Sequence, residues 1–162
     1  MRAGLLAAIL LCASCIPFPH RSYRTPVVHG RIVADGRPVA NIPLRVLADP
    51  RTACEGRYRL EGRTNAEGEF AFCPMPDFQM MLFIVPAHRI FRWSTCAHVN
   101  GRWIVLHESQ RYTLEDAGPR EIERLDCDLG STAEPCRLET DIDITPEKLR
   151  AAVGAQKCAG IP

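Results

Sequence analysis

Apolar and polar residues alternate along residues 27–73, and this period of two predicts a series of short β-strands. In residues 27–34 the alternation places Val28, Ile32 and Ala34 on one face. Three further segments repeat the pattern, with these residues facing inward: Ile42, Leu44 and Val46; Tyr58 and Leu60; Phe70 and Phe72. Four strands are therefore expected before residue 73.

Turn-forming residues separate these strands. Asp35-Gly36 predicts a two-residue hairpin, because glycine adopts a positive φ without steric cost. Residues 48–57 are rich in turn formers, and residues 64–68 predict another turn. Pro43 has no amide hydrogen to donate, so its strand is expected to be an edge strand or to carry a bulge.

Three segments after residue 73 predict additional strands, at residues 79–86, 89–93 and 102–107. Residues 79–86 are apolar on both faces, which is typical of a central strand. Asn100-Gly101 is a turn between the last two segments. With a further candidate at residues 121–125, seven or eight strands are expected.

The C-terminal part is acidic and ends in a predicted helix. Thr145 supplies a helix cap, Pro146 suits the first turn, and Glu147 lies near the positive end of the helix dipole. Two Asp-x-Asp pairs, at residues 126–128 and 141–143, could place carboxylates on one face for calcium. Neither pair has the glycine and distal glutamate of a calcium loop, so a solvated face is expected, with no metal or cofactor.

Residues 27–73 carry a pattern that resembles carboxypeptidase regulatory-like domains, which are transthyretin-like (prealbumin-like) β-sandwiches. The matching residues are Gly30, Ile32, Gly36, Pro38, Val39, Asn41, Ile42, Leu44, Val46, Thr64, Asn65, Gly68, Phe70 and Phe72. The resemblance implies an all-β, seven- or eight-stranded prealbumin-like sandwich with a short C-terminal helix and disulfides. Such domains are mostly accessory or binding modules. The transthyretin-related hydrolases end in Tyr-Arg-Gly-Ser, whereas this chain ends in Cys-Ala-Gly-Ile-Pro, so that activity is not implied.

The N-terminus resembles the signal peptide of bacterial lipoproteins. A positive start and a short apolar stretch precede Cys12-Ala13-Ser14-Cys15, although the family usually has Leu at the position of Cys12. The resemblance implies a signal peptide at residues 1–14, acylation of Cys15 and, because Ile16 follows, the outer membrane. Residues 16–26 hold three prolines and show no periodicity, so residues 15–26 are expected to form an extended, lipidated tether. An ordinary secretory signal that leaves Cys15 as a thiol is the alternative.

The length of 162 residues favours a single folded domain, at residues 27–162. It comprises the motif-matching half at 27–73 and an acidic segment with the helix at 116–162. Charge differs between regions: residues 21–64 hold nine arginines against four acids, and residues 108–147 hold twelve acids against four arginines. Packing of one region beside the other is expected, with patches for a charged partner as the alternative. The overall net charge of +1 argues against nucleic-acid binding.

Six cysteines remain after Cys12 and Cys15 are assigned to the signal and the lipid: Cys54, Cys73, Cys96, Cys127, Cys136 and Cys158. An even number in an exported chain predicts disulfides. The expected pairs are Cys127–Cys136, Cys54–Cys73 and Cys96–Cys158. A zinc site is the rival, but these six cysteines include no Cys-x-x-Cys spacing and the histidines have no paired spacing.

Few features of the sequence suggest that the protein is an enzyme. Cys96 and His98 could form a thiol–imidazole pair, but a disulfide at Cys96 is expected instead. Trp93 and Trp103 could be core residues or a weak binding platform for a sugar or peptide. The main hypothesis is a non-enzymatic lipoprotein that contacts the bilayer through Cys15 and binds an unidentified envelope protein. A small-ligand or glycan-binding lipoprotein is the alternative, and a hydrolase or redox enzyme is the third.

Overall fold

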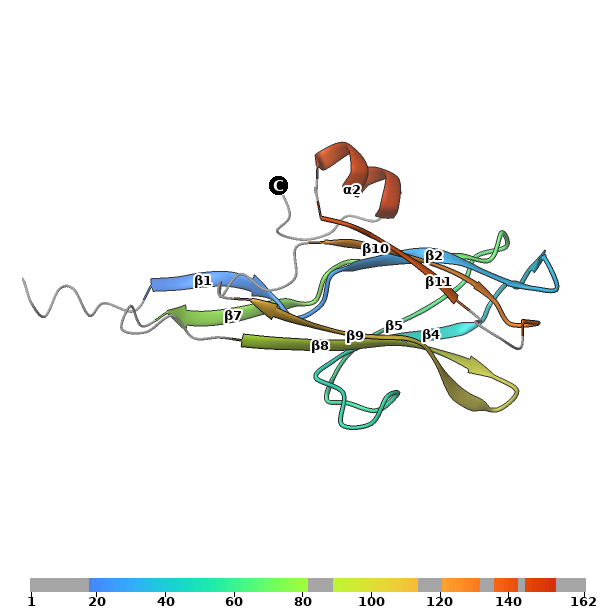
Figure 1. The fold of residues 1–162 in the computed structure, drawn as a ribbon, viewed down its shortest axis with the longest axis horizontal. Helices are drawn as coiled ribbons and strands as arrows, with labels where there is room; N and C mark the ends of the chain where they lie inside the picture. The colour runs from blue at the N-terminus through green and yellow to red at the C-terminus, as the bar shows by residue number, and fades with distance from the viewer. Residues whose placement is uncertain (1–17, 82–88, 114–120, 132–135, 143–144, 154–162) are drawn as a thin grey trace, which may run out of the picture.

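The structure is a computed structural model that describes residues 18–81, 89–113, 121–131, 136–142 and 145–153. These residues form an all-β sandwich with one short helix packed on it (Figure 1). One sheet has five strands in the order β11-β10-β2-β3, with β6 also paired to β2. Its strands are β2 (Val27–Ala34), β3 (Arg37–Pro38), β6 (Glu69–Phe72), β10 (Ile122–Asp128) and β11 (Cys136–Asp141).

The second sheet has four strands in the order β5-β4-β8-β9. Its strands are β4 (Pro43–Ala48), β5 (Tyr58–Arg63), β8 (Arg89–Val99) and β9 (Arg102–Thr113). A separate two-stranded ribbon, formed by β1 (Phe18–Tyr23) and β7 (Pro76–Met81), projects from one end of the sandwich (Figure 1). Helix α2 (Pro146–Val153) lies on the outer face of the five-stranded sheet.

The inner faces of the two sheets carry the residues that the alternation predicts. The buried core residues are Val28, Ile32, Leu44, Val46, Phe70, Phe72, Ala97, Leu106, Leu125 and Cys127. Parallel pairing of β2 with β10 requires a glycine in β2, because a Cβ atom at Gly30 would lie 1.8 Å from the carbonyl oxygen of Leu125. The predicted turns are also confirmed, with positive φ at Asp35, Gly36, Asn100 and Gly101.

Three strands were not expected from the sequence, so the described residues form eleven strands instead of seven or eight. One of them is β1, which pairs with β7 along its whole length. Residues 18–23 are therefore a strand and not the extended tether that their prolines suggested. Residues 79–81 of the predicted central strand belong to the ribbon instead. Residues 82–86 of that prediction lie outside the described residues.

Pro43 lies in a central strand, which corrects the expectation of an edge or a bulge. Strand β4 pairs with β5 on one side and β8 on the other. Pro43 is the first residue of β4, where a missing amide hydrogen is tolerated. The bulge of this sheet lies between β8 and β9, at Thr95 and Cys96.

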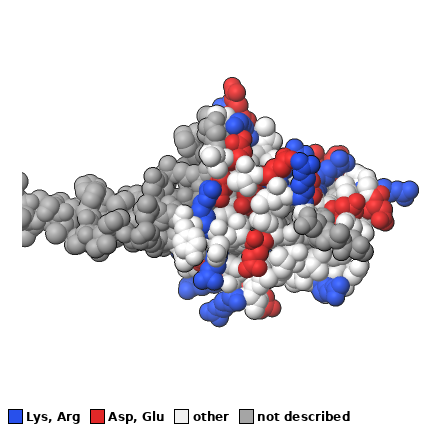
Figure 2. Space-filling view, viewed as in Figure 1, with Lys and Arg blue, Asp and Glu red and all other residues white. Residues whose placement is uncertain are grey.

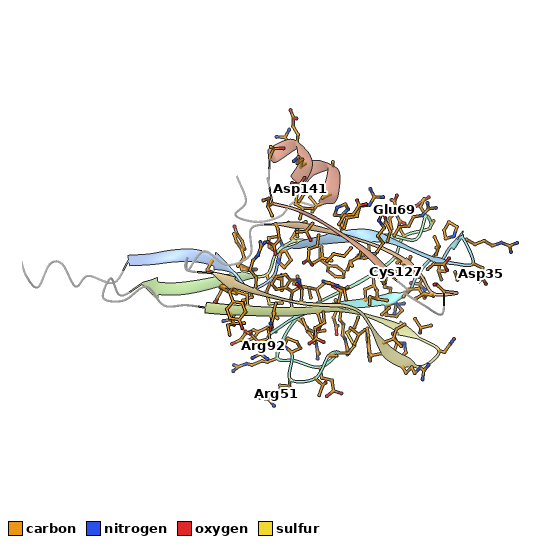
Figure 3. The ribbon with its side chains drawn as sticks, viewed as in Figure 1. Asp35, Arg51, Glu69, Arg92, Cys127 and Asp141 are labelled. Atoms are coloured by element: carbon orange, nitrogen blue, oxygen red, sulfur yellow. A yellow bond between two sulfur atoms is a disulfide. The ribbon has the colours of Figure 1, made fainter. Side chains whose placement is uncertain are left out.

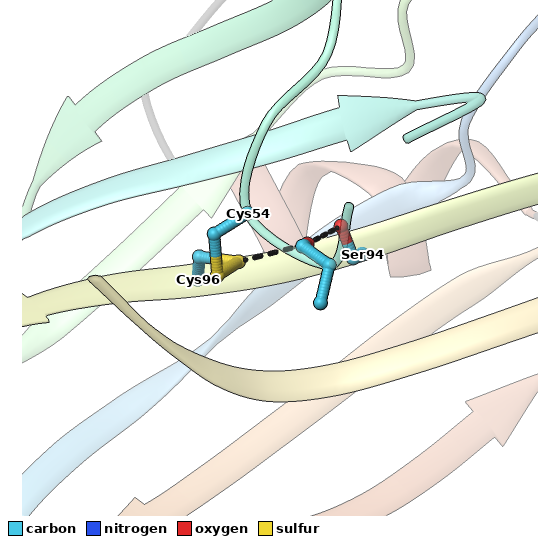
Figure 4. The surroundings of a disulfide bond; sticks show 4 residues. Cys54, Ser94 and Cys96 are labelled. Atoms are coloured by element: carbon cyan, nitrogen blue, oxygen red, sulfur yellow. Dashed lines mark hydrogen bonds between the residues drawn. A yellow bond between two sulfur atoms is a disulfide. The ribbon is translucent and has the colours of Figure 1, made fainter. Parts of the chain in front are cut away.

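One of the three expected disulfide pairs is present, and two are wrong. Cys127 bonds Cys136 as expected, but Cys54 bonds Cys96 across 42 residues. This bond fastens the loop before β5 to the outer face of the four-stranded sheet, where Ser94 also donates a hydrogen bond to the carbonyl oxygen of Ala53 (Figure 4). Cys73 is also disulfide-bonded. Cys12, Cys15 and Cys158 lie outside the described residues.

Helix α2 begins and docks as predicted. The Thr145 hydroxyl accepts a hydrogen bond from the Lys148 amide at 3.2 Å, which caps the helix. Val153 packs in a buried cluster with Val27 and Ile122. The regions of opposite charge lie together as expected, since β10 pairs directly with β2, and basic and acidic residues alternate over the visible face (Figure 2).

Candidate functional site

A groove with a volume of about 710 Å³ lies on the side of the sandwich where β5 and β6 run. Within the described residues, β5 is an edge strand of its sheet and β6 pairs with β2 alone. The groove also reaches β2, β10 and the C-terminal end of α2. We call it the edge groove, and its ionisable lining residues are His29, Arg31, Glu61, Arg63, Glu69, Arg124 and Asp126.

Gly62 in β5 allows the two edge strands to approach. A Cβ atom at this position would lie 3.0 Å from two ring atoms of Phe72 in β6. A larger residue would therefore press against the Phe72 ring and separate the strands. On either side of Gly62, Glu61 and Arg63 are exposed, so β5 presents charged side chains along its outer side.

A second groove, with a volume of about 590 Å³, lies on the other side of β5. We call it the Trp103 groove. It is lined by Pro43, Leu44, Arg45, Glu61, Gly62, Arg63 and Trp103. Since Glu61, Gly62 and Arg63 line both grooves, the two form one recess that passes over β5.

Trp103 is half-buried, and Arg45 covers one face of its indole. The Arg45 guanidinium carbon lies 3.9 Å from the indole centroid, within cation–π range. The same guanidinium donates from Nε to Glu61 at 2.9 Å, and the His98 ring centroid lies 5.1 Å from that of Trp103. The Trp103 groove therefore presents an oriented cation on an aromatic ring and not an open stacking platform.

Trp93 does not contribute to a binding surface. Its side chain is 1% exposed, and its Nε1–H donates to the Glu123 carboxylate at 2.9 Å. In the β8–β9 ladder Trp93 pairs with Ser109, whereas Trp103 pairs with His98 near the opposite end. The proposal of a shared Trp93–Trp103 platform is wrong, because the two indoles lie on different faces and at different ends of the hairpin.

Charged groups inside the sandwich were not found from the sequence. Glu121 and Glu123 are both 2% exposed, and Glu121 forms an ion pair with Arg111 of β9. Burial raises the pKa of Glu123 to about 7, opposed by the hydrogen bond from Trp93 and the charge of Arg111. The alternation of the strand could have indicated their burial, because Glu121 and Glu123 lie four and two positions before the buried Leu125 and therefore share its face.

The cations of the edge groove are oriented by local contacts. Arg124 donates from Nε to Asp126 at 2.9 Å, and Arg31 donates from Nε to the carbonyl oxygen of Glu67 at 2.9 Å. Burial lowers the pKa of His29, and the nearby positive charge of Arg124 lowers it further, although Asp126 acts in the opposite direction. At neutral pH this groove therefore offers guanidinium groups beside a neutral imidazole.

Cys96 and His98 do not form a nucleophilic pair, because the Cys96 sulfur is bonded to Cys54. Asp128 has a structural role: its Oδ1 accepts hydrogen bonds from the amides of Asp35 and Gly130, both at 3.0 Å. Asp141 forms an ion pair with Lys148, and Asp143 lies outside the described residues. In the described part of the chain, no three His, Cys, Asp or Glu residues are grouped to hold a metal ion.

No family model and no curated protein matches the chain. Among solved structures, the chain is similar to 3-chlorocatechol 1,2-dioxygenase from Rhodococcus opacus 1CP, with 17% identity and a TM-score of 0.32. The alignment covers 71% of this chain and 56% of the dioxygenase chain. A similarity this low carries no argument about activity.

Proposed function

We propose that the chain is a lipid-anchored protein of the bacterial outer membrane whose sandwich binds another envelope protein and has no catalytic role. The observation that carries the proposal is the recess over β5, which combines a strand edge with guanidinium groups on both sides. An extended segment of a partner could add to such an edge through backbone hydrogen bonds, while side-chain contacts select the partner.

A photocrosslinking amino acid at Glu61, introduced in the living cell, tests the partner proposal. We expect one dominant crosslinked protein, whose yield falls several-fold when Arg63→Glu is added to reverse the charge of the recess. The matched control carries the crosslinker at Thr140, an exposed residue of β11 on the opposite edge of the sandwich. Equal products from both positions, or none from Glu61, would contradict the proposed site.

The lipid anchor is supported by the N-terminal sequence. Acylation by two or more chains would give stable membrane attachment, whereas one chain is marginal. Among the described residues, no helix has the length and apolarity needed to cross a bilayer. Intact mass measurement of the mature protein should show an acylated Cys15, and Cys15→Ala should lower the share of the protein that is recovered with membranes.

Disulfide mapping provides a second test of the anchor. If Cys12 leaves with the signal and Cys15 is acylated, Cys158 is the cysteine that remains to pair with Cys73. Peptide mapping without reduction should therefore recover a Cys73–Cys158 peptide beside the Cys54–Cys96 and Cys127–Cys136 peptides. A bond between Cys73 and Cys15 would contradict the lipid anchor.

A small anionic ligand or glycan in the Trp103 groove is the second candidate. It is favoured by the half-buried Trp103 and the Arg45 guanidinium beside it. Titration with acidic oligosaccharides should then change the fluorescence of Trp103, and Arg45→Ala should abolish the change. A hydrolase or redox enzyme has less support, because the cysteine proposed as its nucleophile is in a disulfide.

A further inference from the structure

The ribbon of β1 and β7 is separate from both sheets of the sandwich. Its strands pair antiparallel over six positions, from Phe18 with Met81 to Tyr23 with Pro76. Among the described elements, neither strand packs extensively on anything but the other. Figure 1 shows the ribbon extending along the long axis of the molecule. A two-stranded ribbon on its own is at best marginally stable in water.

The composition of the ribbon does not suit an exposed position. Four of its residues are large and apolar: Phe18, Phe78, Met80 and Met81. Residues 79–81 of β7 also begin the segment 79–86, whose sequence is apolar on both faces. By composition the ribbon therefore suits an apolar environment, and among the described strands β1 and β7 pair only with each other.

The base of the ribbon is held firmly against the sandwich. Arg24, which follows β1, forms an ion pair with Asp77 of β7 at 2.8 Å, and its amide donates to the carbonyl oxygen of Met75 at 2.9 Å. The amide of Met75 in turn donates to the hydroxyl of Thr25, which is fully buried. The Arg24 guanidinium carbon also lies 4.0 Å from the ring centroid of Tyr58 in β5, which joins the base of the ribbon to the four-stranded sheet.

The free end of the ribbon lies close to the proposed lipid anchor. Cys15 precedes Phe18 by three residues, which span about 10 Å when extended. A six-residue strand is about 20 Å long. Acylation of Cys15 would therefore bring the start of the ribbon to the surface of the bilayer, where apolar side chains can enter the boundary between headgroups and acyl chains.

The end of the sandwich beside the ribbon also has exposed apolar residues. Ile90 and Tyr112 pair across β8 and β9, with 44% and 68% of their surfaces exposed. Arg92 is exposed on the outer side of the same sheet (Figure 3). Tyrosine and arginine are side chains that suit the interface between membrane and water.

We propose that the ribbon contacts the lipid bilayer as a second membrane contact beside Cys15, with Ile90 and Tyr112 at its flank. This inference rests on the lipid anchor of the proposed function. The ribbon would hold the sandwich at a defined orientation to the membrane and would keep the recess over β5 at a constant distance from it.

Quenching by brominated phospholipids tests the contact in the acylated, full mature protein. A Trp103→Phe background leaves the buried Trp93 as an internal reference. In this background Met80→Trp reports on the ribbon, and Arg37→Trp reports on the hairpin at the opposite end of β2. We expect at least a threefold greater quenching at position 80. Equal quenching at both positions, whether low or high, would overturn the proposal.

Vesicle binding by the unacylated Cys15→Ala variant separates the ribbon from the anchor. With vesicles of phosphatidylethanolamine and phosphatidylglycerol, Met80→Glu should weaken binding about tenfold, the effect of keeping one apolar side chain out of the bilayer. Leu138→Glu, at an exposed apolar residue of β11, should leave binding unchanged. An effect of Met80→Glu on self-association instead of vesicle binding would overturn the proposal in favour of a contact between copies. An unmodified Cys15 in the wild-type protein would overturn the lipid anchor.

Discussion

At the end of the sandwich that carries the Asp35-Gly36 turn, the interior is apolar, whereas at the ribbon end it contains charged groups. Ile32 and Cys127 face each other across β2 and β10 near the turn. Near the ribbon, the hydrogen bond from Trp93 to Glu123 and the ion pair of Arg111 with Glu121 occupy the space between the same two sheets.

The comparison shows two ways of joining the same pair of sheets. Apolar burial is non-directional and does not depend on protonation. A buried carboxylate is stabilised only when its hydrogen-bond and ion-pair partners lie in the correct positions. Removal of one partner leaves an uncompensated buried charge and lowers the stability of the fold strongly. The ribbon end is therefore expected to be the part of the sandwich that responds to pH and that requires specific geometry.

The largest expected effect is at the apolar end. Ile32→Ala should lower the free energy of unfolding by about 2–5 kcal/mol, because it leaves a cavity among fully buried residues. Ile32→Val, the matched control, should cost about 0.5–1.5 kcal/mol. Chemical denaturation at pH 5 and pH 8 should give the same loss at both values. A loss that changes with pH would break the distinction between the two ends.

Glu123→Gln should remove a dependence of stability on pH. The folded state raises the pKa of Glu123 from 4.5 to about 7, so it binds the proton more tightly than the unfolded state. The free energy of unfolding should therefore fall as pH rises between these values, by about 3 kcal/mol at most. The lowered pKa values of His29 and His107 have the opposite effect, because they make the free energy of unfolding rise with pH below 6.5. Wild type and Glu123→Gln both retain these histidines. Parallel stability curves for wild type and Glu123→Gln would contradict the prediction.

Trp93→Phe should lower the free energy of unfolding by about 1–3 kcal/mol, because the buried Glu123 loses its indole donor. The loss should be greater at pH 8, where Glu123 is ionised, than at pH 5. A double-mutant cycle with Glu123→Gln measures the coupling by denaturation. A coupling near zero at both pH values would show that the hydrogen bond does not stabilise the ribbon end.

The smallest expected effect concerns the helix over the ribbon end. Thr145→Ala removes the acceptor for the Lys148 amide and should destabilise α2 by about 1 kcal/mol. Hydrogen exchange should show faster exchange in the first turn of α2, with the rate in β4 unchanged. Thr145→Ser keeps the hydroxyl and is the control. Equal acceleration in both elements would mean that the helix and the apolar end are one cooperative unit.

The local features of the fold were predictable from the sequence. The bounds of β2, the turns at Gly36 and Gly101, and the cap at Thr145 each depend on residues near one another in the chain. The candidate site was less predictable. Arg45, Glu61 and Trp103 lie in three different strands, and no local pattern indicates that they meet.

The sequence by itself determined which residues alternate, where the chain turns and which face of each strand is apolar, because these depend on short-range sterics and periodicity. Only the tertiary structure decided that Cys54 bonds Cys96 and that Glu123 accepts a hydrogen bond from Trp93. It also decided that β7 pairs with β1 outside the sandwich. These outcomes depend on which strands become neighbours, and strand pairing joins segments that are distant in the chain. For residues 79–81, the apolar pattern predicted a central strand of the sandwich, and only their pairing with β1 places them in the ribbon.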